Sequence, residues 1–440
     1  MIASMTNGFT PEGRLEGITM QIADWHGGVK ILGLIYRRFY STQSDADHCT
    51  MYSDRSHIDR RNVTNDPHSN YRPNRDFFLL ILQSRIIAGA MKILGFDSKE
   101  GQPKLFNIPV DIARKTNIQK LSILHAAAGM VVDKYAFAES NIDQLIDNVS
   151  TEQEQQDIRN NQQLTLDGRF PCRFPGCNKS FVLDGKSGKN HERTHDPPIP
   201  IELPTPNLEK PKKDQEKKDV ERDDMFSYNS ALVADGLYFL NFLDAVSEGD
   251  GDRIIRQYKN MLMYCRADHK HSTKYALECL YQFSLVFALL SHRGRERFTW
   301  NRSVNNNGVI GKNIPLDLDV EHSNNYLKQA IKHLGPNLTE KAFSRICKSE
   351  KGVRKITHCM DETLKRSRDP GKQSPSSTTG DLKELMKRLT EHNAMTKMPL
   401  RLYNYFDHFE VDPFKGLDTS VMYSWINEHK KNVSIGIRAR

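Results

Sequence analysis

Cysteine is scarce in this sequence, with seven residues among 440. A small secreted domain held together by disulfides has a much denser set, so this class is excluded. Long apolar runs are lacking too, because the richest one, residues 77–96, is interrupted by Arg85 and Lys92. A membrane span needs about 20 predominantly apolar residues. The N-terminus also lacks the regions of a signal peptide. We therefore expect an intracellular protein that is neither secreted nor embedded in a membrane.

A strong charge of one sign is missing as well. The sequence has 63 basic and 55 acidic residues, which leaves a net charge of +8. This excess is mild for the length and by itself barely favours a nucleic-acid partner. With 38% hydrophobic residues the chain can still form a folded core, and a collagen-like or wholly disordered protein is excluded.

The alternating hydrophobicity of a large β-sheet is absent, and apolar residues recur at helical spacing instead. The pattern predicts a mainly α protein in which two helical blocks are interrupted by a small ββα zinc finger between disordered linkers. The helical stretches that we expect include residues 18–41, 76–94, 108–149 and 319–334. Asp381, three residues before Glu384, is a candidate for the N-cap of a further helix.

Changes in composition set the predicted domain boundaries. Residues 151–168 are almost free of apolar side chains, and residues 197–224 are rich in proline and charge. Such segments cannot bury enough apolar surface to offset the entropy of ordering them. The predicted organisation is a helical block at 1–150, a polar linker at 151–168, a zinc finger at 169–196, a linker at 197–224, a second helical block at 225–366, a linker at 367–380, and C-terminal helices with a basic tail at 381–440.

The sharpest local signal lies in residues 170–195. Two cysteines are separated by four residues, thirteen residues follow, and two histidines are then separated by three. Two thiolates on a short turn and two imidazoles at i and i+4 of a helix supply the four ligands of a tetrahedral Zn²⁺. This segment resembles the C2H2 zinc finger over its whole length, with Phe170 and Phe181 behind the metal. The predicted ligands of the Zn²⁺ cofactor are Cys172, Cys177, His191 and His195.

Two departures weaken the finger. The usual gap between the second cysteine and the first histidine is twelve residues, and Gly188 occupies a position where an apolar residue is expected. Val182 or Leu183 should therefore fill the small core. Because the ligation energy of so small a finger is its folding energy, we expect chelation to unfold this segment alone. The remaining five cysteines are expected to be ordinary buried thiols.

The finger carries a weak signal for reading DNA. Counting back from His191, the base-contacting positions would be Asp184, Ser187 and Asn190, and none is an arginine. One finger covers only about 3 base pairs. Nonspecific contact with nucleic acid remains open, as does a protein-binding or purely structural finger. The cations available for such contact are Lys179, Lys186, Lys189 and Arg193.

Phrases on both sides of the finger are specific enough to suggest a relationship. They include IADWHGGVKILGLIYRRFY, DFFLLILQSRIIAGAMKILG, HSTKYALECL and FTWNRSVNNNGVIGKNIPLDLDVEHSNNYLKQAI. Together they resemble an uncharacterised domain-of-unknown-function family that occurs in multi-copy eukaryotic proteins and is suspected to be transposon-derived. The resemblance implies a transposase-like ancestry for most of the chain.

Transposases of the RNase H-like type hold two Mg²⁺ ions with three carboxylates. Asp24, one of Asp250 and Asp252, and Glu321 are candidates for such a triad. Each has an alternative: acids near the start of a helix are favoured by its dipole, and Asp250 and Asp252 fit a turn before a helix. His26 would then form only a local hydrogen bond.

Longer relatives of this kind carry an aspartate-bearing strand before the phrase NGFTPEGR, which here begins at Asn7. We therefore expect the first acidic segment to be missing and the protein to be no enzyme. The leading hypothesis is a nuclear zinc-finger protein that associates with nucleic acid or chromatin proteins without catalysis. The alternatives are a protein-interaction scaffold with a structural finger and an active DDE-type transposase.

Overall fold

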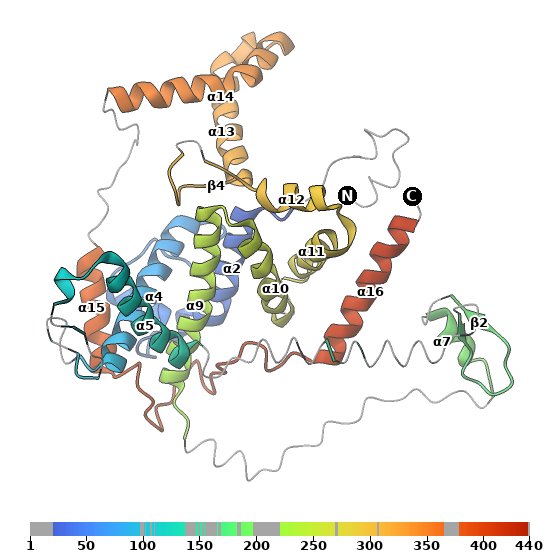
Figure 1. Cartoon of the computed structure of the whole chain (residues 1–440), viewed down its shortest axis with the longest axis horizontal. Coiled ribbons are helices and arrows are strands. Elements are labelled where there is room, and N and C mark those ends of the chain that lie inside the picture. Colours follow the sequence, from blue (N-terminus) through green and yellow to red (C-terminus); the bar gives the residue numbers. More distant parts are fainter. Residues whose placement is uncertain are drawn as a thin grey trace. The chain divides into compact units, whose positions relative to one another are not determined.

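A computed structural model gives the arrangement of the chain (Figure 1). It describes residues 21–96, 111–136, 169–182, 186–196, 221–268, 272–305, 308–364 and 378–438, with a few single positions between these ranges. The chain divides into two units. A helical unit takes Met1–Ser140 and Arg222–Gly416, and a finger unit takes Asn141–Glu221 and Leu417–Ala439.

Both units are built mainly from helices, which confirms the predicted fold class. The finger unit contains β1 (Phe170–Pro171), β2 (Ser180–Phe181), α7 (Lys186–Glu192) and α16 (Thr419–Arg438). The helical unit contains α2 (Asp24–Phe39), η1 (Thr42–Ser44), α3 (Met51–His57), α4 (Tyr71–Leu94), η2 (Ile112–Arg114), α5 (Asn117–Tyr135), α9 (Asp224–Glu248), α10 (Gly251–Ala267), α11 (Thr273–Ser284), the π-helical turn η3 (Leu285–Leu289), α12 (His292–Trp300), β3 (Ser303–Val304), β4 (Ile314–Pro315), α13 (Leu316–Leu334), η4 (Gly335–Asn337), α14 (Glu340–Thr363) and α15 (Thr378–Glu391).

Capping residues decide where several helices begin. The helix expected from residue 108 starts only at Asn117, after Thr116 and Gln119 form a reciprocal capping box. Asp250 caps α10 by accepting from the amide of Arg253 at 3.0 Å, so the predicted turn before a helix is present. Asp381 is not an N-cap, because α15 already starts at Thr378 and places this residue in the first turn.

Helix α9 lies at the centre of the helical unit, in contact with α2, α4, α5 and α10. Its Tyr228, Phe239 and Phe242 are at most 1% exposed. At Gly236 a Cβ would lie 2.6 Å from the side chain of Leu82 on α4, so the absence of a side chain permits the close approach of these two helices. The blocks before and after the finger therefore share one core.

Helix α4 is long and apolar enough to cross a membrane by length and composition, but half of its apolar window is buried inside the protein. It contacts α3, α5, α9 and α15. Its Arg85 is fully buried and pairs with Asp54 on α3 at 2.7 Å. The same guanidinium donates to Asn229 at 2.8 Å and to the carbonyl of Cys49 at 2.7 Å. Packing within the unit thus accounts for the apolar sequence of this helix.

Strands β3 and β4 form a short hairpin between α12 and α13. Ser303 pairs with Pro315 and Val304 with Ile314, in antiparallel register. Helix α13 follows β4 without a break, three residues earlier than the pattern predicted, and packs against α2 and α14.

Other expectations have mixed outcomes. Three of the remaining cysteines are buried as expected, but Cys347 and Cys359 are exposed on α14, so the expectation is wrong for these two. They lie on a helix that packs against α13, and both side chains lie outside that contact. The predicted linkers at 151–168 and 197–224 lie almost wholly outside the described residues, as does most of 367–380.

Candidate metal centre

The two cysteines of the finger are positioned by a short hairpin. Strands β1 and β2 pair antiparallel, with Phe170 opposite Phe181. The amide of Cys172 donates to the carbonyl of Lys179 at 2.7 Å, which closes the hairpin. Gly176 has a φ of +83°, a conformation that glycine adopts without strain, and it turns the chain toward Cys177. Both sulfurs are thereby brought to the same side of the hairpin as the histidines.

Helix α7 and the turn that follows it supply the other two groups. His191 lies in its last turn and His195 follows four residues later, so their imidazoles converge. Their Nε2 atoms are 3.1 Å apart. His191 Nε2 lies 3.2 Å from the sulfur of Cys177, and His195 Nε2 lies 3.3 Å from the sulfur of Cys172.

These atoms fit a tetrahedral zinc ion. The four ligand atoms all lie within 4.8 Å of one another. Bond lengths of about 2.3 Å to sulfur and 2.0 Å to nitrogen imply tetrahedral edges of roughly 3.3–3.8 Å. The observed nitrogen–sulfur and nitrogen–nitrogen distances of 3.1–3.3 Å are close to these edges. Within the described part of the chain, this is the one group of three or more such ligands that could hold a metal ion.

Aromatic rings support the histidines on both sides. Phe174 stacks on His195, with ring centroids 4.2 Å apart and an interplanar angle of 6°. Phe181 lies 5.5 Å from His191 and also packs over Gly188. Val182 does not fill the finger core, because it is 69% exposed, and Leu183 lies outside the described residues. A Cβ at residue 188 would lie 3.5 Å from the ring of Phe181, in ordinary van der Waals contact, so this ring covers the helix where an apolar side chain was expected.

An ion pair that the sequence analysis did not foresee joins the hairpin to the helix. Glu192 accepts two hydrogen bonds from the Arg173 guanidinium, at 2.9 and 2.7 Å, and one from its backbone amide. The hydrogen bond with Arg173 lowers the pKa of Glu192. Burial, together with the charge of Lys179, lowers the pKa of His191 and favours the neutral imidazole that can bind a metal. A bidentate arginine–carboxylate pair thus fixes the helix on the hairpin.

The surface of the finger carries few groups suited to reading bases. Ser187 and Asn190 are exposed on α7, and Asp184 lies outside the described residues. Of the four predicted cations, Lys179, Lys189 and Arg193 are exposed, whereas the side chain of Lys186 is not described.

The acidic candidates for a catalytic triad are not brought together. Asp24 is 5% exposed and forms a bidentate pair with Arg302, at 2.7 and 3.0 Å. It also accepts a hydrogen bond from the hydroxyl of Tyr258 at 2.8 Å. Asp250 caps α10, and Asp252 and Glu321 are exposed on different helices. Asp24 is the first residue of α2, and its carboxylate is held inside the protein.

The carboxylate of Asp317 binds the start of α2 around His26. Asp317, in the first turn of α13, accepts from the backbone amides of Trp25 and His26 at 3.2 and 3.1 Å. It also contacts the His26 ring at 2.9 Å, so this histidine hydrogen-bonds to a carboxylate distant in sequence. Asp319 pairs with Arg354 of α14 at 2.8 Å. Asp317 and Asp319 lie in the first turn of α13, where the helix dipole favours acids, and they also contact α2 and α14.

Residues 3–373 match a family of unknown function, DUF6589. The chain belongs to this family. The match covers both sides of the finger, in agreement with the phrases that resembled an uncharacterised family. No curated protein and no solved structure matches the chain.

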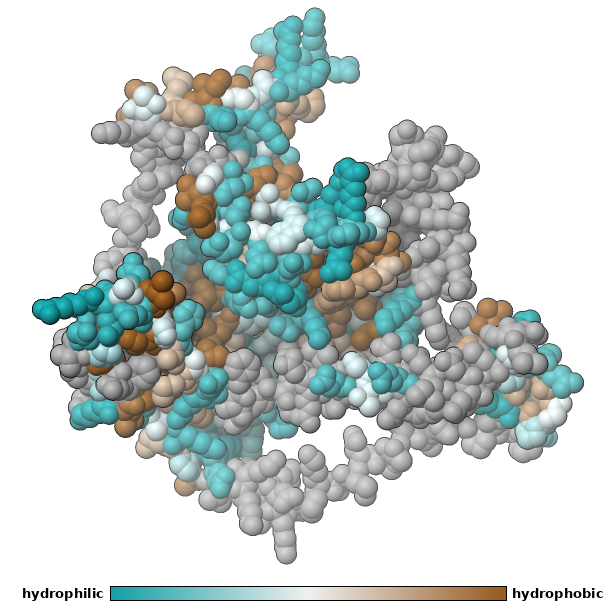
Figure 2. All heavy atoms as spheres, in the orientation of Figure 1, coloured by the Kyte–Doolittle hydropathy of each residue, from teal (hydrophilic) through white to brown (hydrophobic). Residues whose placement is uncertain are grey.

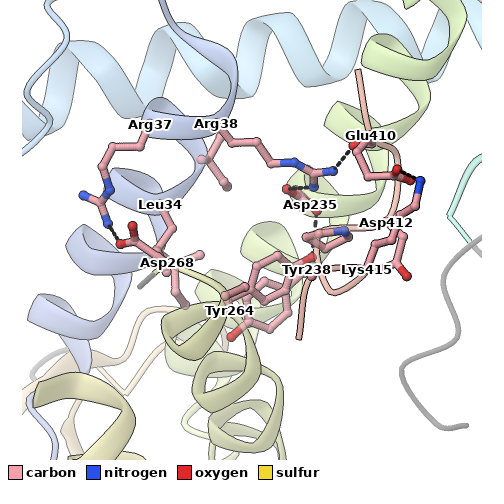
Figure 3. Close-up of a pocket in the computed structure, with 15 residues that line it drawn as sticks. Leu34, Arg37, Arg38, Asp235, Tyr238, Tyr264, Asp268, Glu410, Asp412 and Lys415 are labelled. Carbon is pink, nitrogen blue, oxygen red and sulfur yellow. Dashed lines mark hydrogen bonds and ion pairs between the residues drawn. The ribbon is translucent and has the colours of Figure 1, made fainter. Parts of the chain in front are cut away.

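The helical unit of this DUF6589 member also has a cavity of about 380 Å³ (Figure 3). Helices α2, α9 and α10 and residues 410–416 line it. Arg37 pairs with Asp268 at 2.5 Å, and Arg38 pairs with Asp235 at 2.7 Å. Both arginines thus pair with acids of the same unit. The charged groups that line the cavity therefore indicate no particular class of ligand.

Proposed function

We propose that this protein is a zinc-binding C2H2-type protein that associates with nucleic acid without catalysis. The observation that carries the proposal is the convergence of two sulfurs and two imidazole nitrogens within 4.8 Å. Zinc is the metal that such a set of two cysteines and two histidines selects in structural sites. All four positions are filled by protein ligands, so the site suits a structural ion rather than a catalytic one.

Metal binding is tested by the zinc content of the purified protein. One Zn²⁺ per chain is expected, and Cys177→Ser should lose it. Cys359→Ser is the matched control, because this exposed cysteine lies outside the ligand cluster and should leave the zinc content unchanged. Cobalt substitution offers a second readout, since tetrahedral Co²⁺ bound by thiolates has an intense visible absorption. A chain without stoichiometric metal would contradict this part of the proposal.

Association with nucleic acid is supported by the exposed cations of the finger, Lys179, Lys189 and Arg193. Such side chains bind phosphates and carry little sequence information. A single finger covers about 3 base pairs, so nonspecific association is expected. Duplex affinity should fall steeply with salt and should be weakened by Cys177→Ser. Salt-independent or absent binding would favour a protein-interaction scaffold with a structural finger instead.

We also propose that the protein descends from a transposon and is located in the nucleus. Both proposals rest on the resemblance of the flanking phrases and on the expected nucleic-acid partner. The absence of catalysis is supported by Asp24, whose carboxylate is engaged by Arg302. Cleavage of DNA in Mg²⁺ or Mn²⁺ that Glu321→Gln abolishes would refute it and establish an active DDE-type transposase. Fractionation of cells that express a tagged chain tests the location.

A further inference from the structure

Helix α14 has a stripe of cations that neither the finger nor the core uses. Five basic residues recur along it at intervals of four, three, three and four residues. At 3.6 residues per turn they fall within about a third of the helix circumference. All five are exposed, and no other described residue forms an ion pair with them. We call this set the α14 stripe, and its members are Lys341, Arg345, Lys348, Lys351 and Lys355.

The stripe is open because α14 uses other faces for packing. Arg354, outside the stripe, donates to Asp319 at 2.8 Å and to Ser323 at 3.0 Å, both on α13. Arg354 also pairs with Glu350 at 3.2 Å, so the one strongly buried acid of the helix is neutralised by a residue outside the stripe. Between Lys341 and Lys355 no carboxylate lies on the arc of the stripe. The stripe is therefore a one-signed surface.

The length of the stripe matches a segment of duplex. Fourteen residue steps of an α-helix span about 21 Å. Double-stranded DNA rises about 3.4 Å per base pair, so this length covers roughly six base pairs. Five cations along six base pairs can each meet a phosphate of one strand or of both strands across a groove. Exposed lysines and arginines of this kind supply the sequence-independent part of DNA affinity.

We propose that the α14 stripe is a binding surface for duplex DNA, separate from the zinc finger. The inference rests on the proposed function in naming nucleic acid as the partner, but it assigns the main phosphate contacts to the helical unit. It gives the chain two DNA contacts in different units. A single finger that reads few bases then needs to supply only part of the affinity, the part that Cys177→Ser removes.

The distribution of apolar residues favours DNA over an anionic membrane. A helix that lies on a membrane needs apolar side chains at the same level as its cations. The most exposed apolar residues of α14 are Ile356, at 63%, and Met360, at 55%, and both follow the stripe. Phe343 and Val353 lie within the length of the stripe, but they are less exposed, at 42% and 40%, and helical spacing places them outside its arc. Figure 2 shows hydrophilic side chains covering one end of the hairpin formed by α13 and α14. The exposed apolar residues of the helix thus lie beyond the stripe or outside its arc.

The test compares two triple variants of the full chain. Lys341→Ala, Lys348→Ala and Lys355→Ala remove three stripe charges, and alanine preserves the helix. The matched control, Lys134→Ala, Lys383→Ala and Lys387→Ala, removes three exposed lysines on α5 and α15. Affinity for a 20-base-pair duplex is measured by fluorescence anisotropy from 50 to 300 mM salt. Circular dichroism and zinc content verify that each variant is folded.

The stripe variant should bind at least tenfold more weakly at 100 mM salt. The slope of log affinity against log salt should decrease in magnitude by about 2.7, for three phosphates at about 0.9 each. A Lys→Arg triple at the same positions should bind like the wild type. The same decrease should appear in a Cys177→Ser background, so a failure of the finger cannot be mistaken for a failure of the stripe.

Three results would overturn the inference. The stripe variant could bind as tightly as the wild type, or the control triple could lose as much affinity, which would leave only an effect of net charge. Alternatively, vesicles that contain phosphatidylserine could bind the stripe more tightly than the duplex does, which would make it a membrane surface.

Discussion

Removal of zinc should unfold the finger and leave the helical unit intact. The finger has two strands of two residues each and a helix of seven. An isolated helix shorter than about 12 residues is marginal in water. Ligation of a structural zinc contributes about 10–16 kcal/mol at neutral pH, which is far more than these short elements supply. A chelator, or Cys177→Ser, should therefore abolish the order of residues 170–195 in one step.

The size of the spectroscopic change follows from the element lengths. Helix α7 has seven residues, whereas α9 alone has 25 and α4 has 24. The loss of ellipticity at 222 nm should thus be less than a third of the contribution of α9. Because α9 and α4 contact each other through the core of the helical unit and no finger residue caps them, their melting temperature should not change.

The assay combines circular dichroism with limited proteolysis of the full chain. Trypsin should cut at Lys179 or Lys189 only after chelation, and added zinc should restore protection. Cys359→Ser is the control, since it removes an exposed thiol without touching the cluster. A cooperative loss of helical signal throughout the chain on chelation would refute the reasoning, because zinc would then stabilise the helical unit as well.

Three further predictions concern the helical unit. Arg85→Met should lower the free energy of unfolding by about 3–5 kcal/mol in urea titrations, because it leaves the buried Asp54 without its main partner; a change below 1 kcal/mol would contradict this. Gly251→Ala should cost at least about 1–3 kcal/mol, since its Cβ would lie 1.8 Å from a carbonyl oxygen of α12. Gly352→Ala, with nothing within 4 Å, should be neutral or stabilising in the same urea titrations. Asp317→Ala should cost about 1–2 kcal/mol by removing the acceptor for the first amides of α2, and an unchanged stability would argue against this cap.

The zinc ligands could be predicted from the sequence because the chemistry is local. Cys172 and His195 are separated by 23 residues, and one hairpin and one helix suffice to bring them together. Helix positions could be predicted from apolar periodicity for the same reason. The predicted ends of the helices were less accurate than their positions, because helix ends depend on individual caps such as Thr116 rather than on periodicity.

The long-range polar contacts could not be predicted. Arg85 interrupts an apolar run, and nothing nearby in the sequence identifies Asn229, 144 residues away, as a partner. Asp317 and His26 are 291 residues apart, so their contact depends on how the two blocks fold together. The stripe on α14 could have been found from its spacing, but its exposure follows only from the way in which Arg354 holds the helix against α13.

These contacts also suggest what the family sequence encodes. The phrase that contains Asp24 lies near the start of the DUF6589 match, and the phrase that contains Arg302 and Asp317 lies near its end. In the fold the two phrases meet, because Arg302 pairs with Asp24 and Asp317 caps the helix that Asp24 begins. Asp24, a candidate metal ligand by its sequence, thus helps to join the two blocks on either side of the inserted finger, together with Asp317. The surfaces that we propose for nucleic acid lie elsewhere, on the finger and on α14, so variants of their exposed cations leave the contacts between the two blocks in place.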